Sequence, residues 1–551
     1  MKTKIYILCI ALFLLNSSCN DGFLDTTPYD SIASANIFSN DTYALNALYG
    51  AYNSLAQNSF AANFYVFVSA LGPEGYGRVR GDWGISQGMG IADARNGQYL
   101  NNYRNFYRTI IYANDVIVGL DGNENVTETV RNQYIGEAKF LRGLCYFYLW
   151  NLFGGVVILD KPIPVEDSYL PRNTKEEVLD LIIADFSDAI TKLPASNEGR
   201  ATKGAAVAML GKTYLYNKQW SEAAEQFEIL LAAPFEYDLV ENYADNFRFQ
   251  TQNNEESVFE IQYSMNPGSG SSFNNWFGTR VVGLGPGQDY CEMSQRAFKV
   301  FTYSDDSPID FSTIPQRSNY SNDVTYGNDL TDWYQEVLTG VDKRLHQSAI
   351  LPGSRYHGYT DRLYKYYWPI SIHRSDDPPA LWHTFGDDAI IPIRKFVTEG
   401  QENTVGRTEC PTNFPVIRFA DVLLMYAEAK NEVSGPDANV YNAIDRVRER
   451  AELLGLISLK PSLTKDEMRR EIWLERFREF MFESILFFDV RRWHVAHTDD
   501  PVFGLNHTEV DFRLMTEWYK KVFRENRDYL WPIPGAEIDI NPLITQNPGW
   551  N

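Results

Sequence analysis

The chain has 551 residues and a formal net charge of −22, because 72 Asp and Glu residues outnumber 50 Lys and Arg residues. Such an excess of negative charge repels nucleic acid, so we exclude nucleic-acid binding. The seven His and five Cys residues form no CxxC pair and no recognised metal-ligand spacing. We therefore expect no bound metal and no cofactor.

The N-terminal segment has the form of a bacterial lipoprotein signal. Two lysines precede the apolar run Ile5–Leu15, which at about 1.5 Å per helical residue is too short to cross a bilayer core of about 30 Å. Two serines then lead to Cys19, although Asn16 stands where a lipobox usually has Leu. We predict a signal peptide over residues 1–18, then lipidation of Cys19 and a tether over residues 19–40. Ordinary secretion with an incidental cysteine is the alternative.

Three stretches with helical periodicity follow. Apolar residues at steps of three and four predict amphipathic helices over residues 41–55 and 103–120. A third helix, over residues 134–153, has apolar residues around most of its circumference and should be buried on several sides. Gly154 and Gly155 are expected to end it.

Residues 203–233 match the tetratricopeptide pattern L-G-x2-Y…A-x3-F, although Val207 replaces its leading Trp. The small Gly211 should let one helix approach its partner closely, while Tyr214 and Phe227 fill the gap between the two. Degenerate repeats separated by long inserts predict an interrupted helical scaffold rather than a uniform solenoid. Looser matches combine Leu141 with Ile182 and Phe186, and Leu423 and Leu424 with Ala443 and Val447.

Helical periodicity fades between about residues 240 and 410, where Gly, Pro, Asn, Asp and aromatic residues dominate. This turn chemistry marks loops. Long irregular inserts are usually either functional or disordered, and the many aromatic side chains argue against disorder.

Five segments spread along the chain form a recognisable set. They are "CNDGFLDTTP" (19–28), "GEAKFLRGLCYFYLWNLFGGV" (136–156), "FPVIRFADVLLMYAEAKNEV" (Phe414–Val433), "RFREFMFESILFFDVRRW" (Arg476–Trp493) and "LWPIPGAEIDINPLITQNPGW" (Leu530–Trp550). In this order they resemble motifs of the SusD/RagB family of Bacteroidota outer-membrane lipoproteins.

The resemblance implies an all-α dominated, SusD-like fold built on tetratricopeptide-type helix pairs with a long irregular insert. It implies a single domain over residues 41–551, with the scaffold at about 41–240 and 411–497 and a ligand-facing, loop-rich region at about 241–410. One departure is the segment Glu483–Leu486, where the family often has Glu-Gly-x-Arg-Trp. This difference is expected to alter local packing or a polar contact.

The resemblance also implies a function. Members of this family are lipid-anchored on the outer membrane, facing outward. They act as substrate-binding lids over SusC-like TonB-dependent transporters, mostly for glycans and sometimes for peptides. No chemistry is attributed to them, so we expect this chain not to be an enzyme.

Two aromatic residues in loop-like sequence carry the site prediction. Trp83 follows Asp82, and Trp276 follows Asn274 and Asn275. A flat aromatic face beside amide or carboxylate groups suits a sugar, which offers both apolar C–H faces and hydroxyls. We predict these five residues as ligand-binding; the alternative is that each supports its own loop.

Catalytic signals are weak. The chain has no HExxH or GxSxG motif, and the four histidines between residues 346 and 383 are spaced so that no two share a helical face. A glycosidase needs only two acids about 5 to 9.5 Å apart in space, so a lipid-anchored glycoside hydrolase stays as a rival. A purely adhesive surface protein is the other.

Charged residues alternate in sign along residues 469–492, where arginines and glutamates are interleaved. We interpret them as ion pairs that hold helices together rather than as an anion site. The Asp pair at residues 305 and 306 is interpreted as solvated loop acids, because no EF-hand spacing surrounds it.

Overall fold

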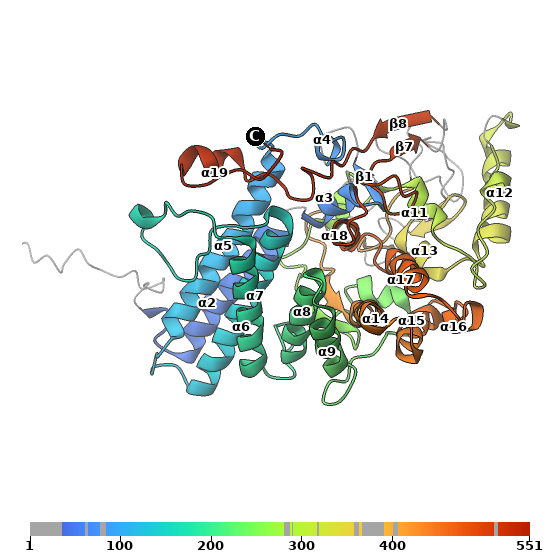
Figure 1. Ribbon diagram of the computed structural model, residues 1–551. Coiled ribbons are helices and arrows are strands. Elements are labelled where there is room, and N and C mark those ends of the chain that lie inside the picture. The colour runs from blue at the N-terminus through green and yellow to red at the C-terminus, as the bar shows by residue number, and fades with distance from the viewer. Residues whose placement is uncertain are drawn as a thin grey trace, which may run out of the picture.

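Helices dominate the fold (Figure 1). The computed structural model describes residues 36–60, 64–77, 84–279, 287–288, 290–316, 319–357, 363–365, 391–400, 406–511 and 516–550. The predicted segments at residues 1–35, including Cys19, and at residues 78–83, including Asp82 and Trp83, lie outside these ranges.

The N-terminal part is a layer of packed helices, in which α2, α5, α6 and α7 run side by side and α8 and α9 lie next to them (Figure 1). Its elements are α2 (Asp41–Ser54), the π-helix η3 (Leu55–Phe60), α3 (Phe64–Leu71), α4 (Ile85–Gly88), α5 (Gly97–Leu120), α6 (Glu128–Phe153), the 3-10 helix η4 (Val165–Asp167), α7 (Lys175–Lys192), α8 (Lys203–Tyr216) and α9 (Trp220–Leu230).

The C-terminal part continues this layer, because α14 packs against α9, α15 and α17. Its helices are α14 (Phe419–Ser434), α15 (Ala438–Arg450), α16 (Leu456–Leu459), α17 (Lys465–Glu479), α18 (Leu486–Arg492) and α19 (Gly535–Ile540).

The three predicted helices are confirmed; the first starts at Asp41, as predicted, and the other two start earlier than predicted. The second begins earlier than expected because Asn96 caps α5, its side-chain oxygen accepting a hydrogen bond from the backbone N–H of Gln98 at 2.9 Å. The third ends where expected, at Gly154, whose φ of 75° lies in the left-handed region that favours glycine.

The tetratricopeptide match is confirmed in α8 and α9. A Cβ atom on Gly211 would lie 2.8 Å from Cε1 of Phe227 and 3.0 Å from Cβ of Gln226, so the two helices are in close contact there. Phe227 is wholly buried, whereas Tyr214 is only half-buried. The looser matches also correspond to packed pairs, α6 with α7 and α14 with α15.

The middle of the chain contains more helix than its sequence suggested. Residues 241–410 include η5 (Tyr243–Phe247), α10 (Phe273–Trp276), α11 (Gln295–Lys299), η6 (Phe311–Thr313), α12 (Asp323–Trp333), the π-helix η8 (Tyr334–Leu338) and α13 (Lys343–Ser348). Most of these helices span less than two turns, and the longest, α12, is rich in Asp, Asn and Thr, so their periodicity is weak. Trp276, expected in a loop, ends the one-turn helix α10.

The described strands form four two-stranded antiparallel sheets. Two of these sheets join segments far apart in the sequence, and the other two pair neighbouring segments. The pairs are β1 (Gly75–Gly77) with β3 (Cys291–Met293), β2 (Ser257–Ile261) with β6 (Phe414–Arg418), β4 (Arg355–His357) with β5 (Leu363–Lys365), and β7 (Thr508–Asp511) with β8 (Thr516–Lys520).

Within the described part of the chain, none of the helices combines the length and apolar composition that a membrane span requires.

The close contact at Gly211 generates a stability prediction. Replacing Gly211 by Leu should overpack the α8–α9 contact and lower the free energy of unfolding by about 1–3 kcal/mol, measured by chemical denaturation. The control is Gly97→Leu at the exposed start of α5, where an added Cβ meets no atom within 4 Å. An unfolding midpoint unchanged by Gly211→Leu would contradict the close packing.

Candidate functional site

The described part of the predicted ligand site lies on α10, which is joined to the segment 287–290 by backbone hydrogen bonds. The N–H of Gln288 donates to the carbonyl of Asn275 at 2.6 Å, and the N–H of Tyr290 donates to the carbonyl of Trp276 at 2.8 Å. This pairing brings Tyr290, which sequence reasoning missed, next to the predicted Trp276.

An aromatic cluster fixes the base of α10. The ring of Phe273 is fully buried and lies 4.1 Å from the ring of Tyr65 and 4.6 Å from that of Phe396, centroid to centroid. Phe414 lies 6.1 Å from Phe273 on the same cluster. Aromatic pairs at such distances add stability beyond the area that they bury, so this one-turn helix has a firm support.

Asn274 has a structural role. It is completely buried, its Nδ2 donates to Oγ1 of Thr398 at 2.8 Å, and its Oδ1 accepts from the backbone N–H of Thr398 at 3.0 Å. Both the Nδ2 and the Oδ1 of Asn274 form hydrogen bonds within the fold, so this buried side chain is not available to a ligand in this structure. Sequence reasoning treated Asn274 and Asn275 alike, but successive helical residues point about 100° apart.

Asn275 and Trp276 are placed differently. Trp276 is half-buried, and its ring centroid lies 5.1 Å from that of the half-buried Tyr290, with the planes tilted by 39°. Asn275 keeps only 6% of its surface exposed, and its Oδ1 accepts no hydrogen bond from the described residues. The two rings therefore form a partly open aromatic surface, whereas the Oδ1 of Asn275 is itself buried.

The segment 391–400 links this surface to the protein interior. Phe396 stacks on Phe273, and Thr398 holds Asn274. The buried Lys395, in the same segment, contacts the helical scaffold: its Nζ donates to Oε1 of Glu483 at 3.0 Å and to the carbonyl of Met481 at 2.8 Å. One short stretch of chain thus contacts both the base of α10 and a buried charge network.

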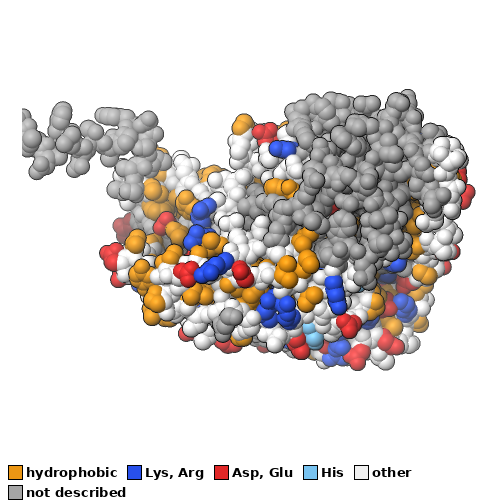
Figure 2. Space-filling model, turned by 90° about the horizontal axis from the view of Figure 1, so that it is seen from above, with side chains coloured by type: hydrophobic (Ala, Val, Ile, Leu, Met, Phe, Trp, Pro, Cys, Tyr) orange, Lys and Arg blue, Asp and Glu red, His pale blue; other side chains and the backbone are white. Residues whose placement is uncertain are grey.

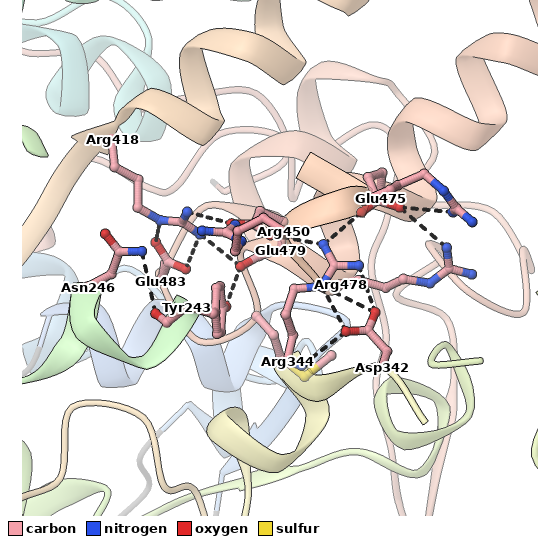
Figure 3. Close-up of polar contacts among 12 residues, drawn as sticks. Tyr243, Asn246, Asp342, Arg344, Arg418, Arg450, Glu475, Arg478, Glu479 and Glu483 are labelled. Atoms are coloured by element: carbon pink, nitrogen blue, oxygen red, sulfur yellow. Dashed lines mark hydrogen bonds and ion pairs between the residues drawn. The ribbon is translucent and has the colours of Figure 1, made fainter. Parts of the chain in front are cut away.

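Figure 3 shows part of that network, including Arg418, Arg450, Glu479 and Glu483. Arg418 donates to carboxylates of Glu256, Glu479 and Glu483 at 2.5 to 2.9 Å, and Arg450 binds both Glu256 and Glu479. All of these side chains are buried or nearly so. The interpretation of the charged stretch as ion pairs that hold helices is therefore confirmed at its centre.

A second arginine extends the network into the loop-rich region. Arg344, at the start of α13, donates to Asp342, Glu475 and Glu479 at 2.7 to 3.2 Å (Figure 3). Asp306, expected to be a solvated acid, instead pairs with Arg448 at 2.9 Å. The α17 carboxylates thus connect to residues from the middle of the chain.

The electrostatics follow from this crowding of arginines. Burial opposes ionisation of Glu479, but Arg450, Arg418 and Arg344 outweigh it and hold the pKa of that carboxyl well below its usual range. Burial likewise opposes ionisation of Asp421, yet Lys212 and Arg476 lower its pKa to about 2. Because these pKa values are depressed in the folded state, the stability they confer is present above about pH 4 and is lost as the pH falls toward 2.

A polar hollow of about 250 Å³ also borders the segment 391–400. Arg394 and Glu399 form a bidentate pair on its lining, at 2.6 and 2.7 Å. The other lining side chains include Phe247, Arg248 and His357. Its mixture of polar and aromatic side chains is of the kind that binds a polyhydroxylated ligand. On the described surface seen from above, hydrophobic, basic and acidic side chains are interspersed (Figure 2).

Comparison with known proteins decides the family. Residues 255–550 match the SusD family, and residues 22–215 match a family described as starch-binding and associating with the outer membrane. The first match alone covers more than half of the chain. The chain belongs to the SusD family. Both the resemblance and the predicted fold class are thereby confirmed.

Relatives in the SusD family are similar over most of their length. A SusD-like protein of Bacteroides ovatus is 25% identical over 604 aligned positions, covering 100% of this chain and 98% of its own. The starch-binding protein SusD of Bacteroides thetaiotaomicron is 25% identical and covers 78% of this chain and 75% of its own. A crystal structure of a SusD-like protein from Bacteroides fragilis superposes with a TM-score of 0.75 at 22% identity, covering 95% of this chain and 100% of that one.

The departure from the SusD-family motif at Glu483–Leu486 makes polar contacts beneath the site. Glu483 pairs with Arg418 and Lys395 in the charge network. Ser484 adopts a left-handed φ of 60°, and its hydroxyl donates to the carbonyl of Tyr65 at 2.8 Å. Tyr65 belongs to the aromatic cluster under α10, so the altered segment contacts both supports of the candidate site.

Proposed function

We propose that this SusD-family protein is a surface-exposed outer-membrane lipoprotein that binds glycans and delivers them to a SusC-like TonB-dependent transporter, without catalysing a reaction. The starch-binding name of one relative and the description of the family matched by residues 22–215 support the ligand class and the location. The observation that carries the proposal is the Trp276–Tyr290 aromatic surface on its anchored helix.

This surface has the chemistry that a sugar needs. A sugar ring stacks its C–H face on an aromatic ring, and the half-buried rings of Trp276 and Tyr290 offer such a face. Because the Phe273 cluster and Thr398 hold α10 in place, little conformational entropy is lost when the ligand binds. The surface is open, so affinity should be modest, and a polymer should bind better than a single sugar.

Asp82 and Trp83 stay part of the proposal as a second contact. They come from a different part of the chain from Trp276, and an aromatic residue with a carboxylate beside it would extend the surface along an oligosaccharide. An extended ligand that stacks at both places would gain affinity from each contact.

The proposal separates from its rivals by simple assays. Incubating soluble polysaccharides with the protein should release no new reducing ends, whereas a glycoside hydrolase would release them. A peptide-binding member of the family would bind none of the polysaccharides tested but would bind peptides. An adhesive protein would show no saturable binding and would not co-purify with a transporter.

Trp276→Ala tests the site. Removing the stacking face should weaken binding of soluble starch, or of whichever polysaccharide in a panel binds the wild type, by at least about tenfold, with an unchanged melting temperature. Native affinity electrophoresis and a thermal scan measure the two quantities. The control is Tyr112→Ala, which removes an exposed aromatic side chain from α5. A lowered melting temperature with retained binding would assign Trp276 a structural role instead.

Cys19→Ala tests the anchor. Each buried acyl methylene contributes about 0.8 kcal/mol, so the loss of several chains should move the protein from the membrane pellet to the soluble fraction. Cell fractionation with immunoblotting measures this, in a strain lacking the proposed SusC-like transporter so that this partner does not retain the mutant. Protease treatment of intact cells reports the outward orientation. Mutant protein that stays in the pellet under these conditions would contradict lipidation at Cys19.

A further inference from the structure

Three side chains with metal-binding atoms converge after α18. Nε2 of His494 lies 3.2 Å from Oε1 of Glu525, and Nε2 of His497 lies 3.6 Å from the same oxygen. One ligand atom from each of the three residues lies within 4.8 Å of the others, the one such group found among the described residues.

The turn that follows the C-terminal end of α18 brings the two histidines together. The helix finishes with a Schellman turn, in which the N–H of His494 donates to the carbonyl of Arg491 and the N–H of Val495 donates to that of Val490. His494 occupies the left-handed position of this turn, with φ 61°, where Gly is usual. The centroid of its ring lies 4.9 Å from that of His497, so the two imidazoles are neighbours.

The opposite side of the cluster is fixed by residues 523–529. Nδ1 of His497 is 2.7 Å from the hydroxyl of Tyr529, whose ring packs on Phe523 at 4.9 Å and on His494 at 4.5 Å. When Nδ1–H donates to the Tyr529 oxygen, the lone pair of Nε2 points to the Glu525 side. Such an outer hydrogen bond is the usual partner of a metal-binding histidine, because it fixes the tautomer and the orientation of the ring.

Two of the three donor separations match those around a small divalent ion. Ligand atoms about 2.0–2.2 Å from a tetrahedral zinc ion are about 3.4 Å apart; each histidine Nε2 lies 3.2 or 3.6 Å from Oε1 of Glu525, and donor atoms of the two histidines lie within 4.8 Å of each other. The side chains of His494 and Glu525 are 53% and 61% exposed, so an ion can enter and a fourth position is open to water. Two imidazoles and one carboxylate suit zinc and its neighbours, whereas Ca²⁺ and Mg²⁺ prefer oxygen ligands.

We propose that His494, His497 and Glu525 bind a divalent transition-metal ion of the Zn²⁺ class. The ion would link the end of α18 to the segment 523–529, a junction where Arg491 already donates to the carbonyl of Tyr529. This reverses the sequence-based expectation of no metal. In the sequence, only the H-x-x-H spacing of His494 and His497 could have indicated a metal site. Glu525 is distant in the sequence and is brought to the two histidines by the fold.

Metal titration tests the proposal. Tag-free mature protein, stripped with a chelator, is titrated with Zn²⁺ by calorimetry and with Co²⁺ by visible absorption, whose intense bands report four-coordination. We expect one equivalent of Zn²⁺ to bind and to raise the melting temperature. His497→Gln and Glu525→Gln should each weaken binding at least about tenfold, while their metal-free melting temperatures match that of the wild type.

The control is His357→Gln, which removes an exposed histidine from β4 and should leave Zn²⁺ binding unchanged. Two outcomes would overturn the proposal. One is wild-type protein that binds no Zn²⁺ in calorimetry. The other is equal Zn²⁺ affinity and equal Co²⁺ spectra in the wild type, His497→Gln and Glu525→Gln, which would place the ion elsewhere.

Discussion

The buried charge network around Glu479 and Arg418 is the constraint on which the rest of the structure depends. Burying a carboxylate or guanidinium costs several kcal/mol unless its partners are complete, and here each arginine contacts two or three acids. The partners come from distant parts of the chain, from Glu256 within the loop-rich region to Arg450 after it. Satisfying these charges therefore fixes where the middle of the chain lies against the helical scaffold.

The buried charge network holds the candidate site in place through the segment 391–400. The segment 391–400 contributes Lys395 to the charges, Phe396 to the aromatic cluster and Thr398 to the support of α10. Trp276 and Tyr290 lie at the far end of this chain of contacts. A one-turn helix has almost no stability of its own, so the aromatic surface exists because the segments beneath it are held from the interior.

The sequence predicted those features that local pattern determines. Helical periodicity indicated α2, α5 and α6, and the small Gly211 with Phe227 indicated a tight helix pair. Both patterns involve only residues that are close together in the sequence, such as 203–233 for the helix pair. Features that depend on distant partners were missed or misread. The role of Asn274 is set by Thr398, and the contribution of Tyr290 is set by backbone pairing with α10. Nothing local distinguishes such residues from ordinary loop polars and aromatics.

The most direct test of this account is hydrogen exchange in Lys395→Met, which cuts the link between the network and the site. The amides of Thr398, Phe277 and Tyr290 should exchange at least about tenfold faster than in the wild type, while those of α8 and α9 stay unchanged. Lys343→Met is the matched control, because that lysine pairs with Glu452 at the exposed surface. Unchanged exchange at all three amides, or acceleration that is equal in α8 and α9, would contradict the dependence of the site on the buried charges.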